Sequence, residues 1–410
     1  MYRRETQLMP RDPCLNCGAK SVETLINFGL QPPSNRFLAK DAVDSEMHSL
    51  VVGQCLECGL IQLIQPMPVS MVKPRFEWVT YSEPENHLDD LIGRLLKLPG
   101  ISTESKIIGL SYLDEPALAR FSRSGFPHVL RCDAQRDSDI ADRRAGLETI
   151  QSRMTEEIAA KLVRHHGKAD ILLARYIVEH SHNPRQFLQS LAQMVTPAGY
   201  LVLELPDCSK FVQACDYSFI WEEHICYFSG RTAADLASRS GFEIVDLITY
   251  SRPLEDSIVV VLRSTGIDQA PLSDAGKDRE LAMGKRFAEA FGNVRARHQK
   301  YLARLRAEGK KIAIFGAGHL AAKFLNLLDL GQYVDCVIDD NPHKQGLAMP
   351  GSRLPIMGSA ALKERGIDLC LLSVSPESES KVLSKHQDFA QRGGRFSSIF
   401  ALSPLALHPE

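Results

Sequence analysis

The nine residues GYLVLELPD, Gly199 to Asp207, decide the fold of this chain. The run is apolar and rich in strand-forming residues until it reaches Pro206 and Asp207. Such a run, bounded by turn-forming residues, is typical of a β-strand. We expect a central strand here, with Pro206 and Asp207 at its carboxyl end.

Segments around this strand alternate between strand and helix patterns. Short apolar runs predict further strands at residues 105–111, 127–133 and 169–180. Helical patterns lie between them, at residues 115–125, 156–167 and 183–195. This alternation predicts an α/β fold with a doubly wound parallel sheet, where ligands bind at the carboxyl ends of the strands. Polar residues expected at those ends are Ser111, Asp133, Arg175 and Asp207.

Length and charge limit the function classes. The chain has 410 residues, which is too long for one core and suggests two to four domains. Its net charge of −2 gives no electrostatic reason to expect nucleic acid or an anionic membrane as a partner. We find neither a membrane-length apolar run nor the apolar core of a secretory signal, so we expect a cytoplasmic protein.

Two CxxCG motifs stand near the N-terminus. Cys14 and Cys17 form one pair, and Cys55 and Cys58 form the other. Two such pairs predict a tetrahedral zinc site with four thiolates. Because all four ligands are cysteine, no position is left open for water or substrate, and we interpret the zinc as structural. A redox dithiol would need only one pair.

A second α/β unit follows a long polar helix predicted at Lys277–Glu308. There, a strand leads into Gly316-Ala317-Gly318 and then into a helix. Gly-x-Gly at such a turn indicates phosphate binding near a helix N-terminus, although the third glycine of a dinucleotide fingerprint is missing. We divide the chain into a zinc-binding domain at 1–75, a central domain at 76–270 and a C-terminal domain at 271–410.

The segment FIWEEHICYF, Phe219 to Phe228, raises the question of function. It places Glu222, Glu223 and His224 in the most aromatic stretch of the chain. One interpretation is a surface turn at the edge of a core. The other is a general base in a pocket, because burial and a neighbouring carboxylate can tune a histidine toward neutral pH.

These motifs together resemble those of the nucleotide-sugar C-methyltransferases. The resemblance rests on the paired CxxCG motifs, on EEHICYF, and on GAG with DDNPHKQGLAMPG near the C-terminus, in the same order along nearly the whole chain. Members of that family methylate a carbon next to the keto group of a TDP-linked deoxysugar. The resemblance implies a zinc-binding domain, a central class I S-adenosylmethionine domain and a C-terminal Rossmann-like domain.

The resemblance also assigns roles to residues of the aromatic segment. It implies that His224 removes the proton next to the ketone and that Glu223 orients it or touches the sugar. Tyr81 would polarise the carbonyl group or bind the sugar. The family's tyrosine before the Glu-His pair is Trp221 here, so one hydroxyl group is missing.

The cofactor loop departs from the family pattern. S-adenosylmethionine domains usually carry Gly-x-Gly-x-Gly after the first strand, whereas this chain has Gly109 followed by bulky Leu110, Tyr112 and Leu113. Asp114 remains available to meet the ammonium group of the cofactor. Three interpretations stay open: a variant pocket that binds S-adenosylmethionine, a relative with a changed reaction or ligand, and a non-catalytic partner.

The expected ligands are S-adenosylmethionine, zinc and a small-molecule substrate, which is a nucleotide-linked sugar by resemblance. The expected cofactor residues are Gly109, Ser111, Asp114, Asp133 and Arg175. The expected substrate residues are His87, His182, Trp221, Glu222, Gly316, Gly318, His319 and Lys344. We expect a monomer or a homodimer.

Overall fold

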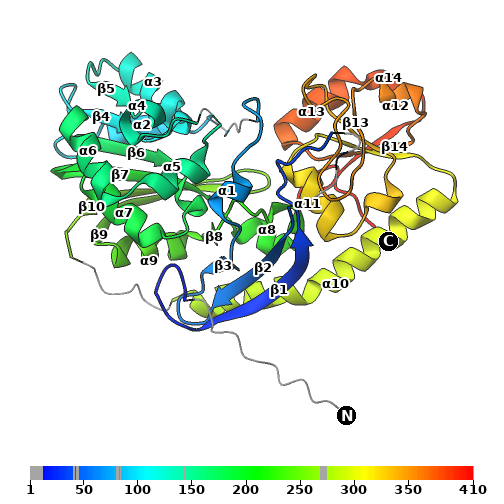
Figure 1. The fold of residues 1–410 in the computed structure, drawn as a ribbon, viewed down its shortest axis with the longest axis horizontal. Coiled ribbons are helices and arrows are strands. Elements are labelled where there is room, and N and C mark those ends of the chain that lie inside the picture. Colours follow the sequence, from blue (N-terminus) through cyan, green and yellow to red (C-terminus); the bar gives the residue numbers. More distant parts are fainter. Residues whose placement is uncertain are drawn as a thin grey trace, which may run out of the picture.

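The structure is a computed structural model that describes residues 13–39, 42, 46–79, 83, 85–142, 144–267 and 275–409. The described chain forms three β-sheets, one for each of three successive regions. Figure 1 shows the central and C-terminal regions side by side, with the N-terminal strands and one long helix below them. This arrangement confirms the predicted α/β class.

The central sheet has the strand order β5-β4-β6-β7-β10-β9. Its strands are β4 (Ile107–Gly109), β5 (Val129–Arg131), β6 (Ala169–Arg175), β7 (Val195–Asp207), β9 (Phe242–Tyr250) and β10 (Asp256–Ser264). The first four are parallel. These are the four predicted strands, and the structure confirms that they are parallel; no strand was predicted at β10, which runs antiparallel to β7 and β9. The connection from Tyr250 to Asp256 is too short for the crossover that a parallel neighbour needs.

Helices cover both faces of the central sheet, as a doubly wound fold requires. One face packs against α2 (Leu88–Leu95) and α3 (Glu115–Arg123). The other packs against α6 (Glu156–His166), α7 (Pro184–Ala192) and α9 (Gly230–Arg239). Shorter helices in this region are α4 (Ala134–Ser138), α5 (Leu147–Arg153) and α8 (Ser209–Ala214).

The N-terminal sheet has the order β1-β2-β3-β8. It consists of β1 (Val22–Gln31), β2 (His48–Cys55), β3 (Ile61–Ile64) and β8 (Cys226–Tyr227), and α1 (Val69–Val72) follows β3. β8 comes from the FIWEEHICYF segment and pairs Tyr227 with Ile61. The aromatic segment is therefore part of the N-terminal sheet as well as of the central region.

The C-terminal sheet is wholly parallel, with the order β13-β12-β11-β14-β15. Its strands are β11 (Ile312–Phe315), β12 (Cys336–Ile338), β13 (Ile356–Met357), β14 (Leu369–Leu372) and β15 (Arg395–Ser398). Its helices are α11 (His319–Leu327), α12 (Ala361–Glu364), α13 (Pro376–Lys385) and α14 (Gln387–Gln391). The strand order reverses beside β11, so the Gly316-Ala317-Gly318 turn lies where Rossmann-like sheets bind ligands.

The long helix α10 (Lys277–Ala307) confirms the predicted connecting helix. Near its start, Gln54 Nε2 of the N-terminal sheet donates a hydrogen bond to the carbonyl oxygen of Glu280, at 3.0 Å. Near its end, Arg306 Nη1 pairs with Asp335 Oδ2 of the C-terminal region, at 2.6 Å. The helix thus spans the distance between these two regions (Figure 1).

The segment after β1 is buried although its sequence is polar and rich in proline. Residues 31–38 are all buried. Leu38 forms an antiparallel bridge with Ala348 of the C-terminal region. The segment therefore lies between the other two regions and contacts both.

Of the helices in the described ranges, none is both long and apolar enough to cross a membrane.

Candidate functional site

The four paired cysteines converge on one point. Cys14 Sγ lies 3.4 Å from Cys58 Sγ, and Cys17 Sγ lies 3.6 Å from Cys55 Sγ. All four sulfur atoms lie within 4.8 Å of one another. Tetrahedral zinc with Zn–S bonds of about 2.3 Å needs sulfur atoms about 3.8 Å apart, so the geometry fits this metal. The four thiolates complete the coordination, which fits a structural ion.

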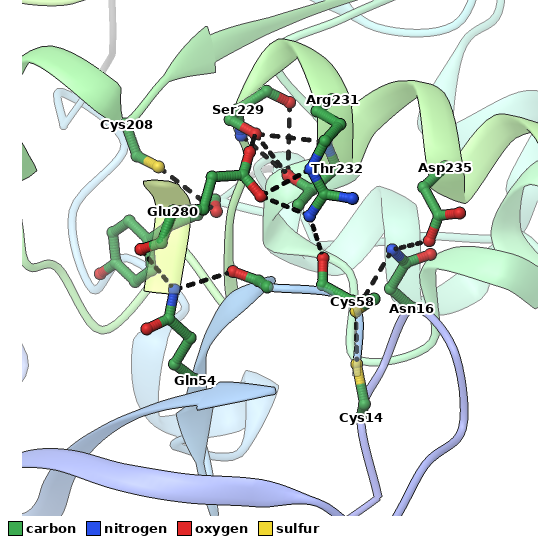
Figure 2. A network of polar contacts seen from close by, with 12 residues as sticks. Cys14, Asn16, Gln54, Cys58, Cys208, Ser229, Arg231, Thr232, Asp235 and Glu280 are labelled. Carbon is green, nitrogen blue, oxygen red and sulfur yellow. Dashed lines mark hydrogen bonds and ion pairs between the residues drawn. The ribbon is translucent and has the colours of Figure 1, made fainter. Parts of the chain in front are cut away.

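Hydrogen bonds around the cysteines fix the N-terminal sheet to two helices (Figure 2). Asn16 Nδ2 donates to Cys58 Sγ at 3.7 Å and to Asp235 Oδ2 of α9 at 3.0 Å. Arg231, also on α9, donates to the carbonyl oxygen of Cys58 and pairs with Glu280 of α10. The cysteine cluster is therefore a junction between domains.

The two glutamates of the aromatic segment are anchors within the protein. Glu222 is fully buried, and its Oε2 lies 2.5 Å from Nζ of Lys323, a fully buried residue of α11. The backbone N–H of Ser34 also donates to Glu222. Glu223 is 2% exposed, and its Oε1 accepts a hydrogen bond from Asn35 Nδ2 at 3.0 Å. The expected contact of Glu222 with substrate is wrong, because its carboxylate is occupied by the protein's own groups.

A tight turn presents His224 to a cavity. The backbone N–H of His224 donates to the carbonyl oxygen of Trp221 at 3.1 Å. Tyr227 closes the turn, since its hydroxyl group accepts from the N–H of Trp221 at 2.8 Å and donates to the carbonyl oxygen of Trp221 at 2.9 Å. The cavity has a volume of about 50 Å³. Its lining residues are Glu83, Leu147, Tyr176, Glu179, His180, Pro206, Trp221, His224 and Glu255.

Three imidazole rings surround Trp221, and all are held neutral. Ring centroids of Trp221 lie 4.9 Å from His224, 6.0 Å from His180 and 4.1 Å from His319. Burial lowers the pKa of His224 well below its usual range, and His180 and His319 lower it further. Burial also lowers the pKa of His180 and of His319 to about 4. Of the two influences considered for His224, burial and a neighbouring carboxylate, burial dominates here and lowers the pKa.

A second cavity, of about 290 Å³, lies on the other side of the Trp221–His319 stack. It is lined by Ser34, Asn35, Phe37, Trp78, Val79, Ala317, Gly318, His319, Asn341 and Lys344. A Cβ added at Gly318 would meet nothing within 4 Å, so this glycine opens onto free space. The predicted substrate residues Gly318, His319 and Lys344 are thus brought together.

Gly316 serves the packing of the turn and does not line that cavity. It has a φ of 106°, and an added Cβ would lie 2.9 Å from Ser373 Oγ. Lys344 Nζ donates to the carbonyl oxygen of Ala317 at 2.8 Å and to Asp339 Oδ2 at 2.9 Å. Asp339 therefore neutralises part of the charge that Lys344 offers to an anionic ligand.

A third hollow adjoins the His224 cavity. It has a volume of about 500 Å³ and lies between the 252–257 segment and α13 of the C-terminal region. It shares with the small cavity the lining residues Glu83, Tyr176, Pro206 and Glu255. A ligand held in this cleft would therefore lie next to the cavity of His224.

The turn after β4, the first strand of the central sheet, is packed by its own side chains. A Cβ added at Gly109 would lie 2.7 Å from Asp114 Cβ and 2.8 Å from Leu118 Cδ1. Asp114 is fully buried and accepts from the N–H of Ser111 at 2.7 Å and from the N–H of Arg175 at 3.0 Å. Burial raises the pKa of Asp114 to about 7. Gly109, Ser111 and Asp114 therefore do not present the open cradle expected for a cofactor.

Arg175 and His87 belong to a buried ion network at the same sheet edge. Arg175 Nε lies 2.5 Å from Glu204 Oε2, and His87 Nε2 lies 2.7 Å from Glu204 Oε1. Arg252 Nη2 donates to Nδ1 of His87 at 2.8 Å. Despite burial, His87 and Arg175 lower the pKa of Glu204 to about 2. Both nitrogens of His87 are occupied, so its expected contact with a sugar is wrong.

The remaining predicted residues lie apart from the cavities. Asp133 is partly exposed at the end of β5, where its Oδ1 caps α4 by accepting from the N–H of Arg136 at 2.8 Å. His182 is partly exposed and lines none of the cavities described above. Tyr81 lies outside the described residues.

Four residues that hold or line the site were not predicted: Ser34, Asn35, Lys323 and Glu179. Ser34, Asn35 and Lys323 hold the two glutamates of the aromatic segment. Glu179 lines the His224 cavity from the turn after β6. Its position beside His180 in VEHSH was the available signal, because His180 already follows a strand that ends at this edge.

Family models match three successive parts of the chain. A zinc binding domain matches residues 14–70, a methyltransferase domain matches 81–247, and a C-methyltransferase C-terminal domain matches 274–401. The chain belongs to the C-methyltransferases. The matched order is the order of the three sheets, and it makes this protein a transferase whose cofactors are S-adenosylmethionine and zinc.

Individual relatives extend the comparison. C-methyltransferase NovU of Streptomyces niveus is 24% identical to this C-methyltransferase over 405 residues, which cover 94% of this chain and 95% of that protein. An O-methyltransferase family protein of Burkholderia thailandensis has 15% identity and a TM-score of 0.28. The match covers 45% of this chain and 59% of that one, less than two thirds of its length. A SAM-dependent methyltransferase of Anabaena variabilis has 15% identity and a TM-score of 0.32, with 44% and 84% coverage.

Proposed function

We propose that this C-methyltransferase acts on a nucleotide-linked keto-deoxysugar or a similar keto compound. In this proposal, His224 removes the proton next to the ketone, and the resulting enolate carbon accepts the methyl group. The observation that carries the proposal is the neutral imidazole of His224 at a cavity that opens into a larger cleft. We keep the domain division at residues 75 and 270 as part of it.

The electrostatics of His224 suit a base. A neutral imidazole has a lone pair that accepts a proton, and burial keeps the ring neutral at physiological pH. The lowered pKa also makes His224 a weak base, since its protonated form is disfavoured. Groups that stabilise the enolate oxygen must therefore supply part of the driving force.

Asp133 and Arg175 are the residues best placed to hold the cofactor. Asp133 lies at the end of β5, where a carboxylate fits ribose hydroxyl groups. Arg175 Nη2 is buried and has no hydrogen-bond partner in the described structure, which fits an anionic group such as the carboxylate of the methionine part. When bound, S-adenosylmethionine supplies an electrophilic methyl group.

The substrate sites follow from the two larger cavities. We place a phosphate group in the cavity lined by Gly318 and Lys344, because the N-terminus of α11 and a lysine both attract anions. The keto sugar would reach His224 through the cleft beside α13. His319 separates the two places and would contact ligand on its exposed edge.

A changed reaction on the same fold is a second candidate. It is favoured by the filled space beside Gly109 and by the fully occupied Asp114 carboxylate. An enolate formed at His224 would then lead to isomerisation or elimination without methyl transfer. A non-catalytic partner role would use the nucleotide pocket alone.

One experiment separates these functions. A TDP-linked keto-deoxysugar is placed in deuterated water with the protein, and exchange of its α-proton is followed by NMR without a methyl donor. We expect exchange in the native protein and a loss of roughly 10²–10⁴-fold in His224→Ala. His128→Ala, at an exposed position, is the matched control. Equal exchange in native protein and His224→Ala would refute the base.

Adding S-adenosylmethionine to the same mixture tests the second half of the proposal. Methyl transfer appears as a mass increase of the sugar. Exchange without any methylation, combined with no heat of S-adenosylmethionine binding, would favour the changed reaction. No exchange with retained nucleotide binding would favour the partner role.

A further inference from the structure

Glu179 is a buried carboxyl group at the candidate active site. It lies in the 3-10 turn Val178–His180 that follows β6. The residue is 1% exposed, and its Oε2 has no hydrogen-bond partner within the described part of the chain. It lines the same cavity as His224. A buried polar atom that lacks a partner is costly, so its presence needs a reason.

The surroundings of Glu179 oppose a negative charge. The described lining of the cavity contains no lysine or arginine, and two further carboxyl groups, Glu83 and Glu255, line it as well. Burial raises the pKa of Glu179 well above its usual range, and Glu83, Glu255 and Glu204 raise it further. A backbone hydrogen bond at Glu179 opposes this rise in pKa, and the nearest side-chain nitrogens belong to the neutral imidazoles of His180 and His224. The burial and the neighbouring carboxyl groups thus favour the protonated form of Glu179, which carries an O–H donor.

The spacing of Glu179, His180 and His224 suits the α-carbon and carbonyl oxygen of a ketone. A carboxylate oxygen of Glu179 and one ring nitrogen each of His180 and His224 all lie within 4.8 Å of one another. In an enolisable ketone, the α-carbon and the carbonyl oxygen are separated by two bonds. A base and a donor at hydrogen-bond distance from these two atoms must themselves lie a few ångströms apart. The Glu179 and His224 side chains meet this requirement.

We infer that Glu179 is a further catalytic residue, a neutral acid that donates a hydrogen bond to the keto oxygen of the substrate while His224 removes the α-proton. The inference rests on the proposed function. The electron pair of the C–H bond moves into the new C=C bond, and the carbonyl pair moves onto oxygen. The proton goes from carbon to the imidazole. The Glu179 proton stays shared with the enolate oxygen, so no further reactant is needed.

Hydrogen-bond donation by Glu179 would compensate for the low basicity of His224. A base with a lowered pKa forms little enolate unless the oxygen is stabilised at the same time. A neutral carboxylic acid is a strong donor for an oxyanion, and in a water-excluded cavity its hydrogen bond is strengthened. The acid and the base line one cavity of about 50 Å³, and a substrate held in the adjoining cleft would displace water from it.

Two substitutions of Glu179 separate donation from charge. Glu179→Gln keeps the shape and an N–H donor, whereas Glu179→Leu keeps the bulk and removes the donor. We expect Glu179→Leu to lower α-proton exchange by roughly 10²–10³-fold, the range for losing one oxyanion donor. We expect Glu179→Gln to stay within roughly tenfold of the native protein. Glu289→Gln, on the exposed surface of α10, is the control.

The pH profile gives a readout that a structural role would not change. The native exchange rate should fall at alkaline pH, as Glu179 loses its proton above its raised pKa. Glu179→Gln cannot lose that proton, so its profile should lack this fall. If Glu179→Leu does not fold, this comparison alone decides: an unchanged alkaline fall in Glu179→Gln overturns the inference.

Other outcomes also decide between explanations. Native-like exchange in Glu179→Leu overturns the donor role of Glu179. The proposed function still stands in that case if His224→Ala abolishes exchange. Equal loss in both Glu179 variants, with native activity that rises on adding Mn²⁺ and falls on chelation, would instead assign Glu179, His180 and His224 to a divalent cation. If His224→Ala exchanges normally, the proposed function itself has failed.

Discussion

Lys323 Nζ and Glu222 Oε2 lie 2.5 Å apart, and neither side chain is exposed to solvent. Lys323 belongs to the C-terminal region, and Glu222 belongs to the aromatic segment that joins the N-terminal sheet. The backbone of Ser34 contacts the same carboxylate. One carboxylate thus holds three parts of the chain beside His224.

Lys323→Met should destabilise the fold, because it leaves the Glu222 charge buried without its partner. We expect the free energy of unfolding to fall by about 3–5 kcal/mol, measured by denaturant titration. The double variant Lys323→Met/Glu222→Gln removes both charges and should recover part of the loss. A single-variant change below about 1 kcal/mol would contradict the buried pair.

Zinc content should be one ion per chain and should depend on the paired cysteines. Cys58→Ser should lose the metal, whereas Cys336→Ser, a buried cysteine in β12, should keep it. Elemental analysis of purified protein measures both. Chelation should also loosen α9 and α10, because Asn16 and Arg231 bind at the cluster. Full metal content in Cys58→Ser would refute the assignment.

The acid side of the pH profile should report His224. Its folded pKa is lowered below the ordinary 6.5, so the neutral base is complete above that value. Exchange of the α-proton should therefore stay constant as pH falls to 6.5 and decline only below it. A midpoint at or above 6.5 in the initial exchange rate would show that burial does not control this histidine.

Gly318→Val should weaken nucleotide binding without loss of stability. An added Cβ meets nothing within 4 Å, and the valine side chain would occupy the cavity that we assign to phosphate. Calorimetry with TDP should show at least a tenfold weaker Kd, with unchanged zinc content. Gly316→Val is the contrasting variant, since its φ of 106° and contact with Ser373 should make it unstable. Unchanged affinity in folded Gly318→Val would move the phosphate elsewhere.

The sequence predicted those features that depend on local spacing. The cysteine pairs, the strand at GYLVLELPD, the connecting helix and the Gly316-Ala317-Gly318 turn each carry their signal within a few residues. The comparisons and the structure confirm the zinc site and the order of the three regions. The position of His224 in the aromatic segment is also local, and its role as base stays a proposal.

What the sequence did not predict depends on partners distant along the chain. The proline-rich segment carries no local sign of burial, yet Ser34 and Asn35 satisfy two glutamates that lie 188 positions away. His87 was assigned to substrate because its partners Glu204 and Arg252 could not be identified. Glu179 was passed over because only the assembled cavity shows that its carboxyl group lacks a countercharge.

The length of helix α10 fixes the orientation of the C-terminal region relative to the rest of the chain. It is held at its start by Gln54 and at its end by Asp335, and it is continuous between them. One residue inserted at its middle would advance the helix by about 1.5 Å and turn everything beyond by about 100°. Lys323 and His319 would then miss Glu222 and Trp221. The number of residues in α10, a helix far from His224, thus determines whether the C-terminal region meets the other two regions at the site.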